Sequence, residues 1–259
     1  MGLTADHLDP PIGGGSGYFV RDRDLRFLDI SEAEVAFWRT QSVPLGLSKL
    51  QYDGFRDDLL DAFRLDGLAI QDCDVRLKGS AAAFFSGHHK RLPWLPGEIL
   101  DAFRDCRGRI PKGWELAEID HRLHRLWITD GVFPARRPFD SMARLGISRE
   151  PSDIDLQVSS DEIVQRCVAE LQALGQDATE VRIKHPTYNF VRKDLVEYAA
   201  PNLYLFALRT SDALNRHMSI AIFPSEGPPD VSDQIGELSS HFRDIDWLIA
   251  GPVDEGGAG

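Results

Sequence analysis

Two aspartates one residue apart open an apolar run at residues 153–158, which read DIDLQV. In a strand, side chains at positions i and i+2 point to the same face, so Asp153 and Asp155 would stand side by side. Two carboxylates that close repel each other unless a cation or hydrogen-bond donors offset their charge. The pair is therefore either solvated at the end of a strand or bound to a metal ion.

A second strand ends in a turn that suits an anion. Residues 73–78 alternate apolar and polar side chains, which predicts a strand with one buried face, and Gly79 and Ser80 follow directly. The next five residues, 81–85, are typical of a short helix. A Gly-Ser turn at a helix N-terminus offers backbone N–H groups and a hydroxyl to a phosphate. Taken alone, the glycine is equally explained by the geometry of the turn.

The pattern of apolar residues along the rest of the chain predicts a fold with both helices and strands, α/β (α+β), in which helices flank a small mixed sheet. Ser31 and Glu34 have the spacing of a capping box, and the helical region that follows ends at Gly67. Further helices are predicted near residues 97–105, 114–128 and 161–174, and further strands at 179–184, 202–209 and 217–223. The tail from residue 252 is expected to be disordered.

Charge and composition narrow the classes of partner. Lys and Arg number 29 against 41 Asp and Glu, so the net charge is -12 and broad binding to duplex DNA is not expected. A local basic groove formed by Arg136, Arg137, Arg144 and Arg149 stays open. No apolar run reaches the roughly 18 residues that span a bilayer, and the first residues lack a signal peptide, so we expect a cytoplasmic protein without a membrane partner. The three cysteines are spaced for neither a disulfide framework nor a zinc ribbon, and buried thiols are expected.

The two elements together resemble the polymerase-beta-like nucleotidyltransferase superfamily. Its signature is an apolar strand that ends in Gly-Ser, a short helix, then Asp-x-Asp between apolar residues, and a third acid on a later strand. Residues 77–87, LKGSAAAFFSG, are similar to the first part and residues 152–158, SDIDLQV, to the second. The resemblance covers residues 74–87 and 150–223, which is under half of the chain.

The resemblance implies a Mg²⁺-dependent or Mn²⁺-dependent enzyme that passes a nucleoside monophosphate from a nucleoside triphosphate, ATP among them, to a hydroxyl acceptor. Asp153 and Asp155 would be catalytic and bind the metal ions. Gly79 and Ser80 would bind the nucleotide phosphates. Glu180 is chosen as the third catalytic acid, because the strand at 217–223 carries Ser219 where an acid is expected. The acceptor is left open between a small molecule, a nucleotide and RNA.

Two features depart from the family pattern. Ser80 and Asp153 are 73 positions apart, so residues 88–150 would form a helical insertion within a domain at 31–230, between an N-terminal segment at 1–30, partly flexible, and a C-terminal segment at 231–259. The uncertain third acid keeps an alternative open, which is a non-catalytic nucleotide-binding or RNA-binding module on the same fold. A chance occurrence of Asp-x-Asp in an acidic chain is the third reading.

Overall fold

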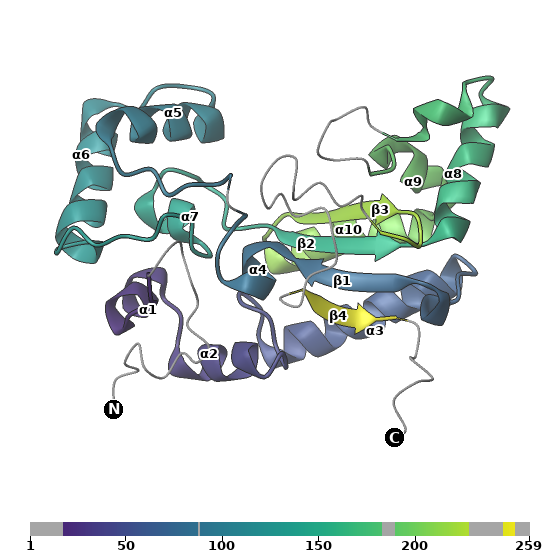
Figure 1. Ribbon diagram of the computed structural model, residues 1–259, viewed down its shortest axis with the longest axis horizontal. Helices are drawn as coiled ribbons and strands as arrows, with labels where there is room; N and C mark the ends of the chain where they lie inside the picture. The colour runs from purple at the N-terminus through teal and green to yellow at the C-terminus, as the bar shows by residue number, and fades with distance from the viewer. Residues whose placement is uncertain (1–17, 88, 183–189, 228–245, 252–259) are drawn as a thin grey trace. The chain divides into compact units, whose positions relative to one another are not determined.

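The computed structural model describes residues 18–87, 89–182, 190–227 and 246–251, and it divides the chain into two compact units. One unit, here called the helical unit, is formed by residues 1–46 and 79–152. The other, here called the sheet unit, is formed by residues 47–78 and 153–259. Figure 1 traces the chain through both units. The insertion predicted at 88–150 falls wholly within the helical unit, and the tail from residue 252 lies outside the described residues.

The helical unit is built from short helices around one apolar cluster. Its helices are α1 (Asp22–Leu28), α2 (Glu32–Arg39), α4 (Gly79–Ala83), α5 (Pro96–Arg107), α6 (Gly113–His121), η3 (Arg122–Trp127) and α7 (Ser141–Leu145). The cluster comprises Leu92, Ile99, Ala102, Phe103, Ile119, Leu123, Trp127, Ile128, Leu145 and Ile147. The predicted helices near 97–105 and 114–128 are confirmed, and both supply apolar side chains to this cluster.

Local capping explains where several of these helices begin. Ser31 accepts a hydrogen bond from the Glu34 backbone N–H, and the Glu34 carboxylate accepts one from the Ser31 backbone N–H, so the predicted capping box is confirmed. Helix α5 begins with Pro96, which lacks the backbone N–H that a first-turn position leaves unpaired. The Glu98 carboxylate accepts hydrogen bonds from the backbone N–H groups of Trp94 and Leu95, which stabilises the entry into α5.

Helix α6 continues directly into the π-helix η3. Element η3 is six residues long and carries Trp127, whose indole is fully buried. The indole Nε1–H donates a 2.9 Å hydrogen bond to Asp24 of α1, and the ring stacks on Phe27 with centroids 4.5 Å apart. These contacts fasten α1 to the cluster of the helical unit.

The sheet unit holds a four-stranded sheet and the longer helices. Its elements are α3 (Lys49–Leu65), η2 (Ile70–Asp72), β1 (Asp74–Lys78), β2 (Ile154–Ser159), α8 (Asp161–Ala173), η4 (Ala178–Val181), α9 (Lys193–Ala199), α10 (Pro201–Leu214), β3 (Met218–Phe223) and β4 (Trp247–Ala250). The strand order is β3-β2-β1-β4. Strand β2 is parallel to β3 and antiparallel to β1, and β1 is antiparallel to β4. The predicted fold class, an α+β fold with a small mixed sheet flanked by helices, is confirmed.

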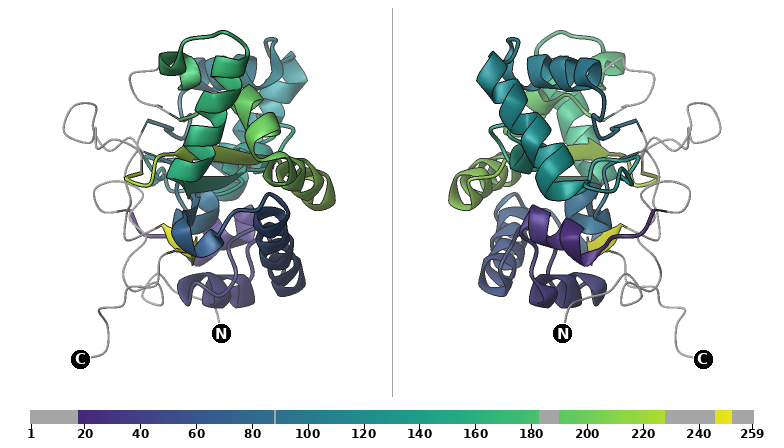
Figure 2. Two further views of the ribbon diagram at one scale, coloured as in Figure 1. Left: turned by 90° about the vertical axis from the view of Figure 1, so that its right-hand side faces the viewer. Right: turned by 90° about the vertical axis from the view of Figure 1, so that its left-hand side faces the viewer.

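One face of the sheet is apolar and faces two helices. Val75, Leu77, Ile154, Leu156 and Val158 alternate along β1 and β2 and are almost completely buried. Helices α3 and α10 run side by side behind the sheet in Figure 1 and lie on the same side of it in Figure 2. Phe55 of α3 and Phe206 of α10 pack with ring centroids 5.3 Å apart. The side chains on this face are therefore committed to the core.

Three predictions about the later elements are wrong. Residues 202–209 lie in α10 and do not form a strand. The predicted strand at 179–184 is a 3₁₀ helix over Ala178–Val181, and residues 183 and 184 lie outside the described part of the chain. Strand β4 was not predicted. The strands predicted at 73–78 and 217–223 and the helix at 161–174 are confirmed. Within the described residues, no helix has the length and apolar character needed to cross a membrane.

Candidate functional site

The second face of the sheet is lined by polar and charged side chains, here called the polar face. Strand alternation and the register of β1, β2 and β3 place the side chains of these strands on this face. Asp246, the residue before β4, is included because its side chain forms an ion pair with Lys78. The side chains of the polar face are Asp74, Arg76 and Lys78 of β1, Asp155, Gln157 and Ser159 of β2, Ser219 of β3, and Asp246. A sheet face that must pack on a helix is normally apolar, so this face is not built for helix packing. It is the candidate site.

Ion pairs and hydrogen bonds join side chains of the polar face, within β1 and between neighbouring strands. Lys78 and Asp246 form an ion pair with Nζ 2.7 Å from Oδ2, and both side chains are almost fully buried. Arg76 and Asp74 form another, with Nε 2.6 Å from Oδ1. Burial of an ionic group is costly unless the group has a partner of opposite charge. Both positively charged side chains of this face, Arg76 and Lys78, have such a partner.

Asp153 and Asp155 lie at the start of β2, as the sequence predicts. Asp155 is half-buried and accepts a 2.7 Å hydrogen bond from the Ser219 hydroxyl on the neighbouring strand. Asp153 precedes the strand and is more exposed, and its Oδ2 lies 3.8 Å from Nδ1 of His217. The Ile154 backbone N–H donates to the His217 carbonyl, which holds the two strands together at this point. The two carboxylates therefore share the start of one strand, where both can be reached.

The structure does not bring Glu180 to the aspartate pair. Glu180 lies in η4, and the Val181 carbonyl next to it accepts from the Arg192 backbone N–H, while Val191 bonds to Ile222. Ile222 is three residues beyond Ser219 on β3, which is roughly 10 Å along a strand. The described part of the chain holds no group of three or more His, Cys, Asp or Glu that would suit a metal ion. At the β3 position opposite Asp155, the residue is Ser219.

Gly79 and Ser80 follow β1 directly but belong to the helical unit, so their place relative to Asp153 and Asp155 is not assigned. Gly79 has φ +72°, a conformation that favours glycine, and it opens α4 immediately after Lys78. Ser80 is buried. Within the sheet unit, Lys78 is the register partner of Asp155, so β1 leaves the sheet opposite the aspartates. The predicted phosphate-binding role of Gly79 and Ser80 stays a prediction.

The aspartate pair suits one magnesium ion. Mg²⁺ is usually bound through one or two carboxylates, with waters and substrate phosphate oxygens completing six ligands. Asp153 and Asp155 supply two carboxylates at the start of β2, and Asp155 makes no ion pair within the described residues. The other acids of the polar face, Asp74 and Asp246, are paired with Arg76 and Lys78, and the described residues hold no group of three acids suited to a metal ion, so the donors present fit a single ion.

Three residues at or beside the polar face do not follow from sequence reasoning. Lys78 is predicted only as part of a strand, and neither Asp246 nor His217, which lies beside Asp153, is predicted as a site residue. Register explains their place, because β1 brings Lys78 opposite Asp155 and β4 begins next to Asp246. For His217 a signal existed, since His217-Met218-Ser219 repeats the polar-apolar-polar pattern of residues 153–155.

Comparison with known proteins identifies no relative of this chain. No family model, no curated protein and no solved structure matches the chain. The candidate function therefore rests on the chemistry of the polar face.

Proposed function

We propose that the protein is a metal-dependent nucleotidyltransferase, which passes a nucleoside monophosphate from a nucleoside triphosphate to a hydroxyl acceptor. The observation that carries the proposal is the pair of carboxylates at the start of β2, Asp155 on the polar face and the exposed Asp153 directly before the strand. In phosphoryl-transfer enzymes, catalysis is mainly the positioning of the reactants and the neutralisation of developing charge. A carboxylate pair beside a buried lysine suits that task.

The roles of the residues follow from their contacts. Asp153 and Asp155 would hold one Mg²⁺, and the Ser219 hydroxyl fixes the orientation of the Asp155 carboxylate by its hydrogen bond. When bound, Mg²⁺ would neutralise triphosphate charge and lower the pKa of the acceptor hydroxyl. In the transfer, a bond forms between the acceptor oxygen and the α-phosphorus while the bond to pyrophosphate breaks, and the acceptor proton leaves to a base.

Ser219 supports the alternative function, which is nucleotide or RNA binding without turnover. The resemblance expects a third acid on a strand next to the aspartate strand, and Ser219 stands opposite Asp155 on β3. A serine hydroxyl cannot serve as a carboxylate ligand for a second metal ion. A protein that binds the nucleotide with one ion and does not transfer it would have this arrangement.

The test is transfer of label from each radiolabelled nucleoside triphosphate, with Mg²⁺ or Mn²⁺, with and without total RNA or a cell extract as the source of acceptor. We expect the natural protein to transfer label or release pyrophosphate, and Asp153→Ala/Asp155→Ala to lose the activity. The matched control is Asp57→Ala/Asp58→Ala, which removes the same charge from the exposed surface of α3. Nucleotide binding without turnover in all acceptor mixtures would favour the alternative.

A further inference from the structure

A shallow pocket in the helical unit is lined mainly by arginines. It has a volume of about 650 Å³ and is formed by α1, the end of α6, η3 and α7. The residues that matter for its chemistry are Arg23, Arg26, Phe27, Arg122, Leu126 and Arg144. The volume falls in the range of ligand-binding pockets. Four guanidinium groups against one lining carboxylate, Glu118, favour an anionic ligand.

The arginines keep donors that the protein does not use. Arg26 is exposed, and its side chain makes no hydrogen bond or ion pair within the described residues. Arg122 donates from Nε to Glu118 and from Nη1 to the Arg144 carbonyl. Arg144 pairs with Asp29 through Nη2, and this pair lies at the surface, where ion pairs contribute little stability and are easily exchanged. Arg23 is partly buried and pairs with Asp130. An anion can therefore bind at Arg26 and Arg144 without breaking a buried interaction.

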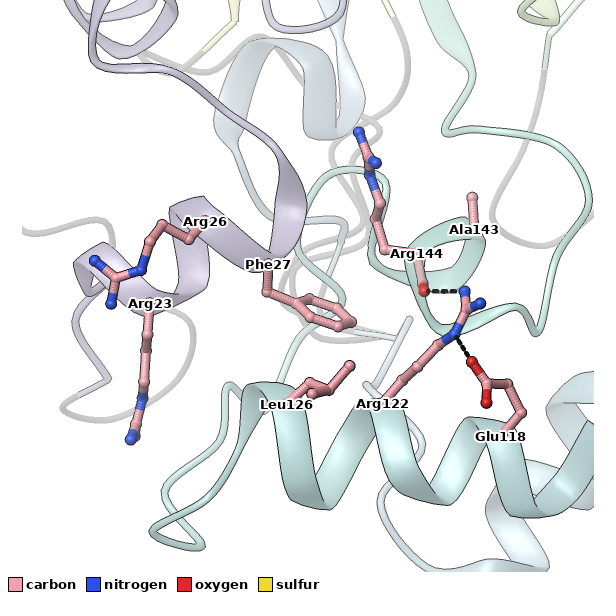
Figure 3. Close-up of a pocket in the computed structure, with 8 residues that line it drawn as sticks. All are labelled: Arg23, Arg26, Phe27, Glu118, Arg122, Leu126, Ala143 and Arg144. Atoms are coloured by element: carbon pink, nitrogen blue, oxygen red, sulfur yellow. Dashed lines mark hydrogen bonds and ion pairs between the residues drawn. The ribbon is translucent and has the colours of Figure 1, made fainter.

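The directions of the arginines point to a ligand with several separated charges. Figure 3 shows Phe27 and Leu126 next to each other, with the guanidinium groups of Arg23, Arg26 and Arg144 pointing in different directions around them. A single phosphate cannot contact three groups that point apart. Phosphates repeated along a strand can contact them in turn, while the apolar side chains between them receive a base. Leu126 is 59% exposed and is available for such a contact.

Two further observations mark this region as more than a solvated surface. The pocket is lined by Arg122 and Leu126, which both come from the π-helix η3, and π-helical turns are rare and frequent at functional sites. The charge of the protein is also uneven. The helical unit carries 16 acidic and 16 basic residues, whereas the sheet unit carries 25 acidic and 13 basic ones. A polyanion is therefore repelled by the net charge of the sheet unit and not by that of the helical unit.

We propose that this arginine-lined pocket binds a segment of single-stranded nucleic acid. The phosphates contact the guanidinium groups, and a base packs on Phe27 and Leu126. The proposal does not depend on nucleotide transfer by the polar face, although a strand held here would suit the nucleic-acid acceptor that the proposed function leaves open. RNA and DNA share the phosphate chemistry, and parallel measurements with both distinguish the two sources.

The test is fluorescence anisotropy of labelled single strands of about eight nucleotides, one of uridines and one of deoxythymidines, with the full chain in EDTA. EDTA removes metal-dependent binding at the aspartates. We expect Arg26→Glu to weaken binding about tenfold and to lower the slope of log affinity against log salt by about one. The matched control is Arg39→Glu, because Arg39 is also exposed, in the last turn of a helix of the same unit and without a partner among the described residues. It should change affinity by less than about twofold.

A second variant separates the apolar contact from the charge. Leu126→Ser should weaken strand binding and leave the salt slope unchanged, because it removes no phosphate contact. The proposal is overturned by absence of strand binding, by equal effects of Arg26→Glu and Arg39→Glu, or by displacement of the strand by pyrophosphate at equal phosphate concentration. Binding of polyglutamate with the same dependence on Arg26 would also overturn it. Asp153→Ala/Asp155→Ala should keep strand binding, so failure of the transfer activity is a separate result.

Discussion

At the scale of single residues, the buried carboxylate of Asp24 joins two helices of the helical unit. Its side chain is 2% exposed and accepts hydrogen bonds from the Trp127 indole and from the backbone and guanidinium groups of Arg21. Removal of a buried ionic partner leaves the remaining donors unpaired. Asp24 therefore links α1 to η3 by electrostatic contacts that its place in the sequence does not reveal.

We predict that Asp24→Ala lowers the free energy of unfolding by about 3 kcal/mol, since it leaves the indole N–H and the Arg21 guanidinium without their buried acceptor. The control is Asp101→Ala, which removes an exposed carboxylate whose one ion-pair partner among the described residues is Arg104 at the surface of α5, and it should cost less than about 0.5 kcal/mol. Urea unfolding followed by circular dichroism measures both. Equal losses in the two variants would refute this role of Asp24.

The cysteines give a second prediction at this scale. Cys73 and Cys167 are buried and Cys106 is exposed, so the expectation of buried thiols holds for two of the three. Burial raises the pKa of Cys167 from 9.0 to about 12, and burial also raises the pKa of Cys73. Partial burial raises the pKa of Cys106 too, so it is exposure that separates the three thiols. Reagent can reach Cys106, whereas Cys73 and Cys167 should stay unreactive because they are buried.

A thiol assay with Ellman's reagent at about pH 8 should therefore report one reactive thiol per folded chain and three after denaturation in guanidinium chloride. Cys106→Ser should remove the reaction of the folded chain and leave two thiols after denaturation. Rapid reaction of a second thiol in the folded protein would contradict the burial of Cys73 and Cys167.

At the scale of secondary structure, helix α10 shows how a distant residue decides a local conformation. Asp66, which caps the end of α3, accepts hydrogen bonds from the backbone N–H groups of Asn202 and Leu203 in the first turn of α10. It also accepts one from the Asn202 side chain. A carboxylate at a helix N-terminus satisfies unpaired donors and interacts favourably with the helix dipole.

We predict that Asp66→Ala lowers the free energy of unfolding by about 1 to 2 kcal/mol, because the first turn of α10 loses its acceptor. Asp61→Ala is the matched control, since Asp61 lies on the exposed surface of the same helix and pairs only with Arg64. Thermal unfolding followed by circular dichroism at 222 nm, the usual wavelength for helix, compares the two. A loss no larger for Asp66→Ala than for Asp61→Ala would exclude the cap.

The same helix explains why one part of the fold escaped prediction. Residues 202–209 are rich in aromatic and leucine side chains, which favoured a strand, but buried Leu203, Phe206 and Thr210 recur at helical spacing. Their N-terminal acceptor, Asp66, is 136 residues away from Asn202 in the sequence, so no local capping pattern marks the start. The capping box at Ser31 was predictable because both of its members lie within four residues.

The candidate site was predictable in part for a similar reason. Asp153 and Asp155 are recognised from alternation within one short stretch, and the structure places them at the start of β2, with Asp155 on the polar face. Lys78, His217 and Asp246 reach that face only through the register of strands that are far apart in sequence. Glu180 was chosen because the alternation of residues 179–184 suggested a strand, whereas Glu180 lies in the 3₁₀ helix Ala178–Val181.

At the scale of the whole molecule, each unit is assembled from two separate stretches of the chain. Residues 79–152 contain the whole apolar cluster of the helical unit, but Phe27 and Asp24, which complete the surroundings of Trp127, come from residues 1–46. A chain of this length buries a small core and is marginally stable by itself. Residues 79–152 should therefore depend on α1 for a stable fold.

We predict that a fragment of residues 79–152 unfolds without a cooperative thermal transition, whereas the same fragment joined by a Gly-Ser linker to residues 18–46 unfolds cooperatively. The reason is that α1 supplies the stacked ring of Phe27 and the acceptor for the buried Trp127 indole. Asp24→Ala in the joined chain should remove most of the gain, and Asp101→Ala in the same chain should keep it. If the fragment without residues 18–46 melted as cooperatively and at the same temperature as the joined chain, α1 would be a peripheral helix. Residues 79–152 would then fold independently of residues 18–46.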